Sequence, residues 1–388
     1  MKRRMIMMIL AMLLAAGGSG YAFAAEPAAN AAMGFTGEVV KLSLEDATKK
    51  MQSDGPGAEA AALNLKAAKA AAKGYNESVT EMNDMLEQYS AMGIISSSLP
   101  NESDVNIIKL QRDFARTQGD FNFEAEMNKL KIDTVRNYFS VLQDLDAVKI
   151  QNENLAVQQR ILANTQKKFE LGIVAKQDVL QAEIAVLAAR DGLTAAQNGS
   201  ALARMGFNNF LGYDVMQDLQ LTDTLKAVEV SSVSLEDAIA RALANRNEIK
   251  AAAFGVKIQD VLMKRIDVRY NSASATYLKQ QVATLNAHEY YNSAITGIEI
   301  DIRNKYMTMM QKKDAIEKGT ASVDKAKELL RLAELSYSVG MNTVSDVHQV
   351  QVMVLGEELS LSQAILDYNL AVYDYDVAAG AGTFAAPL

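Results

Sequence analysis

Apolar residues recur at every third or fourth position over long stretches of the chain, which is the spacing of an amphipathic helix. Val135, Phe139, Leu142, Leu145 and Val148 form one such stripe on an otherwise polar segment. Residues 101–386 contain no proline and are rich in good helix formers. The pattern predicts helices over residues 58–91, 105–171, 176–210, 235–270, 275–339 and 344–378.

The sequence repeats itself once. Residues 42–47 (LSLEDA) recur as 233–238 (VSLEDA), and residues 169–172 (FELG) recur as 337–340 (YSVG). Ser43 and Ser234 each stand before a Glu-Asp pair, which is typical of a helix N-cap followed by acids near the positive end of the helix dipole. We therefore expect two copies of one helical arrangement.

The repeat and the N-terminal composition divide the chain. Lys2, Arg3 and Arg4 precede a short apolar run and a small-x-small pattern at residues 22–24, which is typical of a secretory signal peptide. An uncleaved anchor is the alternative. The expected parts are a signal peptide (1–24), an N-terminal extension (25–41), a first helical repeat (42–212), a connecting segment (213–232), a second helical repeat (233–380) and a C-terminal tail (381–388).

Helices of this length cannot bury an apolar stripe alone, so several must pack side by side within a chain or between chains. The expected fold class is all-α, built from two tandem repeats of long antiparallel helical hairpins. A coiled-coil spacer would show the same periodicity, but it would not produce two halves with matching tip sequences.

The tip sequences resemble those of the TolC-like outer-membrane efflux proteins. Residues 169–183 (FELGIVAKQDVLQAE) are similar to that family's helix-turn-helix tip, and residues 209–212 (NFLG) and 233–249 are similar to its later segments. The resemblance implies a homotrimer forming a hollow α-barrel. It also implies an outward export conduit that works with a periplasmic adaptor and an inner-membrane efflux pump, located in the periplasm and outer membrane.

The same resemblance implies roles for the two tips. Their turns would contact the adaptor, and two acids would line the aperture. An aspartate early in a helix also favours the helix dipole, so a capping role is the alternative for the acids. Asn342 stands where some relatives have a tip arginine. The implied tip residues are Gly172, Ile173, Val174, Ala175, Gly340, Met341, Asn342 and Thr343, and the implied aperture residues are Asp178 and Asp346.

In one respect the sequence departs from the family, whose protomers each add four membrane strands. A spanning strand needs about 9–11 residues. The polar intervals at 92–104 and 271–274 are too short for a pair of such strands. We expect the β-barrel strands to be short or missing, which leaves association with the outer membrane open. Residues 266–270, which alternate in polarity, are a candidate strand.

Composition argues against an enzyme and against a nucleic-acid partner. The chain has no Cys and two His residues, His288 and His348, which we expect on exposed helix surfaces. No phosphate loop, zinc motif or nucleophile elbow occurs, so no cofactor, metal or catalytic residue is predicted. The net charge of −8 disfavours nucleic acid. An export conduit is the preferred function, and a helical envelope spacer or adaptor-like scaffold is the alternative.

Overall fold

The computed structural model describes residues 34–94, 100–230 and 234–386. The chain divides into two units, Met1–Phe35 and Thr36–Leu388, and the second contains all the elements discussed below. The predicted signal peptide lies outside the described residues. Among the described residues, no helix combines the length and the apolar content needed to cross a bilayer.

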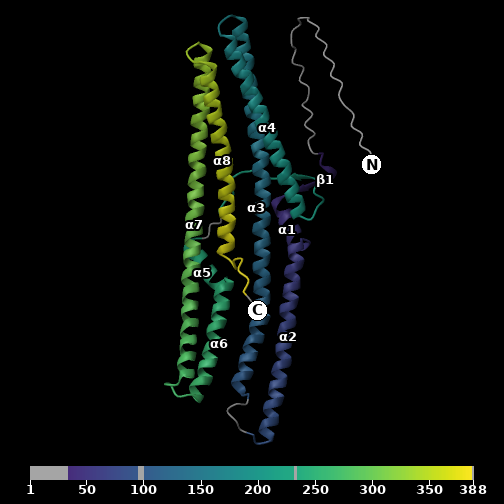
Figure 1. Ribbon diagram of the computed structural model, residues 1–388, viewed down its shortest axis with the longest axis vertical. Coiled ribbons are helices and arrows are strands. Elements are labelled where there is room, and N and C mark those ends of the chain that lie inside the picture. Colours follow the sequence, from purple (N-terminus) through teal and green to yellow (C-terminus); the bar gives the residue numbers. More distant parts are fainter. Residues whose placement is uncertain (1–33, 95–99, 231–233, 387–388) are drawn as a thin grey trace, which may run out of the picture. The chain divides into compact units, whose positions relative to one another are not determined.

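Eight helices account for most of the described residues of the second unit (Figure 1). At 1.5 Å per residue, α3 and α7 are each about 100 Å long. The all-α prediction with two long-hairpin repeats is confirmed, and most predicted helix ends agree within three residues. The helices are α1 (Leu44–Ser53), α2 (Pro56–Ala91), α3 (Glu102–Glu170), α4 (Lys176–Phe210), α5 (Leu235–Asn245), α6 (Asn247–Arg269), α7 (Ala275–Ser338) and α8 (Val344–Ala378).

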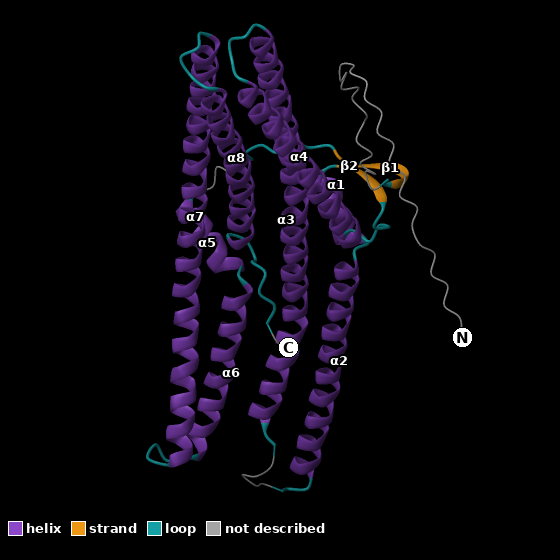
Figure 2. Ribbon diagram, turned by 45° about the horizontal axis from the view of Figure 1, so that its top comes forward, coloured by secondary structure: helices purple, strands orange, loops and turns teal. Residues whose placement is uncertain are grey.

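Each repeat forms two hairpins that share its long central helix. The α3–α4 and α7–α8 hairpins point to one end of the unit, and the α2–α3 and α6–α7 hairpins point to the other (Figures 1 and 2). The capping residues that the sequence indicates start the first helix of each repeat. The Ser43 hydroxyl accepts a hydrogen bond from Asp46 N, and the Ser234 hydroxyl accepts one from Asp237 N, both at 3.1 Å.

The structure corrects the candidate strand at residues 266–270. Residues up to Arg269 belong to α6, and Tyr270 N donates a helical hydrogen bond to Ile266 O at 2.9 Å. A five-residue segment that alternates in polarity is compatible with a helix as well as with a strand. Here it continues the preceding helix, so it is helical. The single helix predicted over 235–270 is also wrong. The extended backbone of Arg246 interrupts this helix. The Arg246 guanidinium pairs with the carboxylates of Glu248 and Asp301.

Two short strands were not predicted. β1 (Thr36–Leu42) and β2 (Gln217–Leu221) pair in parallel (Figure 2). They join the N-terminal extension to the connecting segment between the repeats. The described residues contain no other strand. Strands of seven and five residues, each with a single buried side chain, show too little alternation of buried and exposed positions to be recognised from sequence.

Three apolar clusters form the core of the described residues. Two lie midway along the helices, and a third lies toward the tips around Ile161, Leu330 and Val347. One cluster is built around Tyr138, Phe139 and Phe207, where α1, α3 and α4 meet β2. A second joins α5, α7 and α8 around Ile302 and Tyr375. The rings of Tyr138 and Phe207 meet edge to face at 5.9 Å, a geometry that adds to the stabilisation from burial.

The C-terminal segment links the two repeats through asparagine side chains. Asn122 Nδ2 on α3 donates to Ala386 O at 2.7 Å, and Asn247 Nδ2 on α6 donates to Phe384 O at 2.8 Å. Gln118 Nε2 donates to Asn247 Oδ1 at 2.6 Å, and both side chains are 1% exposed. These hydrogen bonds give the buried amide nitrogens partners and connect α3, α6 and the C-terminal segment.

We expect Asn247→Ala to lower the free energy of unfolding by about 1–3 kcal/mol, because it leaves the buried Gln118 amide and Phe384 carbonyl without this partner. Urea denaturation followed by circular dichroism measures the change. Asn286→Ala, at an exposed position on α7, is the control and should change stability by less than about 0.5 kcal/mol. Equal effects of the two substitutions would contradict the role given to the network.

Candidate functional site

Both predicted tip turns begin with a glycine in the left-handed region. Gly172 has φ of +72° and Gly340 has φ of +81°, a conformation that costs other residues energy. Ile173 N donates to Lys168 O, and Met341 N donates to Ser336 O, each at 2.9 Å. These bonds satisfy the last carbonyls of α3 and α7, so each glycine ends a long helix and reverses the chain.

The tips expose apolar side chains. Leu171 and Ile173 project from the first turn, and Val339 and Met341 project from the second, where Met341 is 80% exposed. Large apolar side chains that are exposed together on a short turn are characteristic of a contact surface. The structure therefore leaves both tips available to a partner.

Asp178 and Asp346 each bind the backbone of their own turn. Asp178 Oδ2 accepts from Ala175 N at 3.0 Å, and Asp346 Oδ2 accepts from Thr343 N at 2.8 Å. The backbone and side-chain hydrogen bonds from Thr343 lower the pKa of the Asp346 carboxyl. This is the capping geometry, so the capping alternative describes what both acids do within one chain.

Polar contacts near the tips hold the first hairpin against the second. The Lys168 ammonium donates to the Tyr337 carbonyl and lies 3.8 Å from the centroid of that residue's ring. The Thr165 hydroxyl lies 2.9 Å from the Tyr337 hydroxyl, and Arg160 pairs with Glu334 at 2.6 Å. The sequence did not identify these residues as a group. Of this group, the sequence repeat singles out only Tyr337, which aligns with Phe169.

A buried polar seam continues this contact between α3 and α8. Gln351 Nε2 donates to Asn154 Oδ1 at 3.0 Å, and Gln158 Nε2 lies 3.2 Å from His348 Nδ1. Burial lowers the pKa of His348. The expectation that His348 is exposed was therefore wrong, because α8 turns this face toward α3. His288 is exposed as expected and lies 3.2 Å from Asp260.

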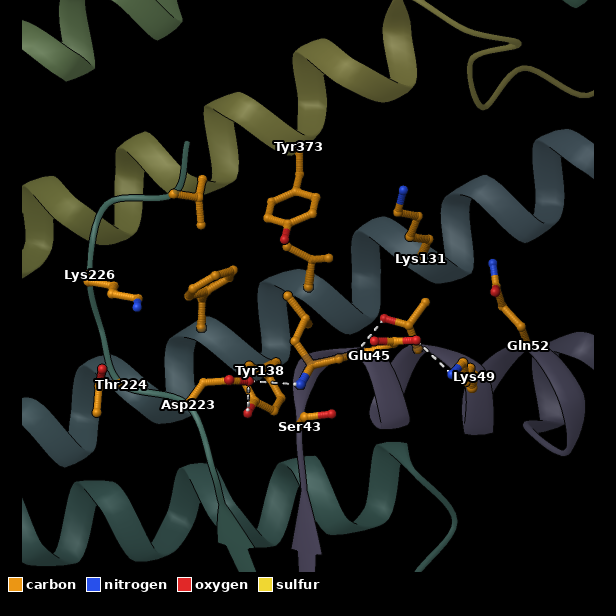
Figure 3. Close-up of a pocket in the computed structure, with 15 residues that line it drawn as sticks. Ser43, Glu45, Lys49, Gln52, Lys131, Tyr138, Asp223, Thr224, Lys226 and Tyr373 are labelled. Atoms are coloured by element: carbon orange, nitrogen blue, oxygen red, sulfur yellow. Dashed lines mark hydrogen bonds and ion pairs between the residues drawn. The ribbon is translucent and has the colours of Figure 1, made fainter. Parts of the chain in front are cut away.

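A cavity of about 590 Å³ lies where α1, α3, α8 and the connecting segment meet (Figure 3). Asp223 Oδ2 accepts from Tyr138 Oη at 2.6 Å and from Leu44 N at 3.0 Å. Burial, and then the hydrogen bond to Asp223, raise the pKa of Tyr138. The charged groups at the rim include Lys49, which pairs with Glu45 at 2.6 Å. This arrangement anchors the connecting segment to the first repeat.

Among the described residues, neither the tips nor this cavity brings together the side chains of a metal site. Within residues 34–94, 100–230 and 234–386, no three His, Cys, Asp or Glu side chains are placed to hold a metal ion. What the geometry offers is two exposed turns at one end of long, laterally linked hairpins.

A family model described as outer membrane efflux protein matches residues 122–212, from within α3 to just beyond the end of α4. The resemblance to TolC-like outer-membrane efflux proteins is confirmed. The matched segment contains the α3–α4 tip, where the sequence resemblance was first seen. No curated protein matches the chain.

Solved structures share the TolC-like arrangement over most of the chain. CusC, which forms a transmembrane channel, is 12% identical with a TM-score of 0.67, and the match covers 87% of this chain and 92% of CusC. The CmeC outer membrane channel of Campylobacter jejuni is 12% identical with a TM-score of 0.64, covering 88% and 86%. The outer membrane protein VceC of Vibrio cholerae is 13% identical with a TM-score of 0.61, covering 88% and 97%. At these identities the likeness establishes the fold.

The lowered pKa of Asp346 predicts a pH dependence at the second tip. A carboxyl whose pKa is lower folded than unfolded stabilises the fold at pH values above its ordinary pKa, and the contribution is lost as the pH falls through the folded value. We expect the protection of the amides of residues 344–347, taken relative to the intrinsic exchange rate at each pH, to fall as the pH is lowered from 5 to 2.5.

Asp346→Asn should remove most of this pH dependence, because an amide does not titrate in this range. Asp324→Asn, at an exposed position on α7, is the matched control and should leave it unchanged. Hydrogen exchange followed by mass spectrometry of tip peptides measures both. A pH profile that Asp346→Asn leaves intact would show that another group controls the tip.

Proposed function

We propose that this chain is the conduit subunit of an envelope export system. Three copies close into a hollow helical barrel, and substrates pass along its interior away from the cell. The family match at residues 122–212 and the fold shared with outer membrane channels support this function. No comparison supports the alternative of a spacer or scaffold.

One observation supports the proposed assembly: a single chain leaves apolar stripes exposed along its helices. Leu180, Ile184 and Leu187 follow one another on α4 at spacings of four and three residues, and all three are exposed. The same spacing recurs on α7. Such stripes are unfavourable in water, and packing against a second copy removes them from it. The exposed α7 residues are Leu278, Val282 and Leu285.

The tips are the proposed partner surface. In the proposed trimer, three copies of each turn lie at the entrance of the conduit, where their exposed apolar side chains meet a periplasmic adaptor and, through it, an inner-membrane pump. The turn residues proposed for this contact are the eight residues implied by the resemblance, 172–175 and 340–343. An envelope location follows from the same proposal, since such a conduit functions outside the cytoplasm.

The aperture proposal adds a second role to Asp178 and Asp346. Their carboxylates cap helices in one chain, and threefold assembly would place six of them at one end of the barrel. A ring of carboxylates attracts cations and repels anions. We propose that these acids make the entrance cation-attracting while they hold the tip turns.

We expect the exported protein to be a hollow trimer, and Ile184→Glu with Leu187→Glu to weaken its self-association at least about 100-fold, because two charges then face an apolar partner. Native mass measurement and electron microscopy show the oligomer. Asn198→Glu, at an exposed polar position of α4, is the control and should keep the trimer. A compact wild-type monomer would refute the conduit.

We expect Ile173→Asp with Met341→Asp to reduce export at least about tenfold while the trimer remains intact, because charge replaces the apolar groups offered to the adaptor. Export of a dye is measured in cells, and the oligomer is measured after purification. Asn292→Asp, exposed on α7 between its two ends, should have no effect. Normal export by the double variant would rule out tip docking.

A further inference from the structure

Four polar side chains meet between α3 of the first tip hairpin and α8 of the second, which run side by side (Figure 1). Asn154 and Gln158 come from α3, and His348 and Gln351 come from α8. The three amide side chains are at most 7% exposed, and His348 is half-buried beside them. Of the four, only His348 changes its charge near neutral pH.

This polar seam suits a neutral imidazole. Gln158 Nε2 lies 3.2 Å from His348 Nδ1, so a neutral ring nitrogen can accept from the amide. A protonated ring donates from both nitrogens and needs an acceptor there. Gln158 Oε1, which is buried and accepts no hydrogen bond from the described residues, reaches the ring only if the amide turns over. That turn leaves Nε2 unpaired instead and supplies no negative charge.

Charged side chains on the surrounding helices do not supply a counter-ion either. Glu153 of α3 is exposed, and Glu183 of α4 does not line the space beside His348. Burial is the cause of the lowered His348 pKa, with no charged neighbour contributing. The other nearby charged groups pair with one another or hold a turn: Arg160 with Glu334, Lys327 with Glu358, Arg331 with Glu328, Lys168 with the Tyr337 carbonyl, and Asp178 and Asp346 with their own turns.

A cavity of about 220 Å³ beside His348 gives a charged ring somewhere to go. It lies between α3, α4 and α8, and much of its wall is apolar, as at Ile161 and Val344. Gln181 and Ser345 also line it and are exposed, so water reaches it. A protonated ring either stays in the seam without a counter-charge or turns into this cavity and leaves Gln158. Both outcomes weaken the contact between α3 and α8.

We propose that His348 makes the contact between the two tip hairpins sensitive to mild acid. Protonation of its imidazole loosens the seam between α3 and α8, and the α7–α8 hairpin then parts more readily from the α3–α4 hairpin. The apolar cluster around Ile161, Leu330 and Val347 also joins these hairpins. The response is therefore a graded increase in local opening and not a separation of the two repeats.

The direction of the effect follows from proton linkage. The pKa of His348 in the folded chain lies below its ordinary value of 6.5, so the closed contact favours the neutral ring. As the pH falls through this region, the open form takes up the proton more readily, and the equilibrium shifts toward opening. The Asp346 carboxyl stays ionised there, because its pKa is lowered from an already acidic value. The two tip residues therefore respond in separate pH ranges.

The test is hydrogen exchange of the exported protein at pH 7.5 and 5.5, followed by mass spectrometry. Protection is taken relative to the intrinsic exchange rate at each pH. We expect peptides from residues 150–165 and 344–354 to lose protection about twofold or more at pH 5.5. Peptides from residues 60–75 of α2, away from the seam, should keep theirs. Unchanged protection of the seam peptides in the wild-type protein would overturn the proposal.

Two substitutions remove the titrating group in different ways. His348→Gln keeps a polar group within reach of Gln158, and His348→Phe keeps the volume of the ring. The variant that retains wild-type protection at pH 7.5 should show no loss at pH 5.5. His288→Gln is the matched control, because His288 is the other histidine of the chain and lies exposed beside Asp260. It should keep the pH response of the seam.

A pH response that survives in the retained His348 variant, or that only His288→Gln abolishes, would also overturn the proposal. The measurement does not involve export. A flat pH profile therefore leaves the conduit standing, and a failed conduit leaves the acid response of the hairpin contact standing.

Discussion

The constraint on which the structure depends is that α3 and α7 are too long to bury their own apolar stripes. An isolated helix of about 100 Å exposes its apolar stripe to water over its whole length. Within the chain, α4, α8 and the shorter helices cover part of each stripe, and the densest packing is midway along the rods around Tyr138, Phe207 and Ile302. The remainder stays exposed in one chain, and we propose that assembly with further copies covers it.

The two repeats are held together by different chemistry at different levels. Midway, aromatic and aliphatic side chains form a dry core, and Asp223 ties the connecting segment to Tyr138 and the start of α1. Toward the tips, a third apolar cluster around Ile161, Leu330 and Val347 joins α3, α4, α7 and α8. Buried amides and the Lys168–Tyr337 contact lie beside this cluster.

The two ends of the unit present different surfaces. At the tips, glycine-centred turns expose Ile173 and Met341, and the nearby carboxylates cap the helices. At the other end, Val268 is exposed and Arg265 of α6 pairs with Asp104 at the start of α3. We propose that the two ends meet different partners, as the proposed conduit requires.

The sequence alone determined the helices, their turns and their duplication. Periodicity marks long helices, Gly172 and Gly340 mark the reversals, and Ser43 and Ser234 mark the helix starts, because each of these signals is local. Tertiary structure decided the rest. The β1–β2 pair, the ion pair at the Arg246 break, the partial burial of His348 and the contact of Lys168 with Tyr337 all involve residues far apart in the chain. No local spacing encodes these contacts, since each forms only when segments distant in the sequence pack together.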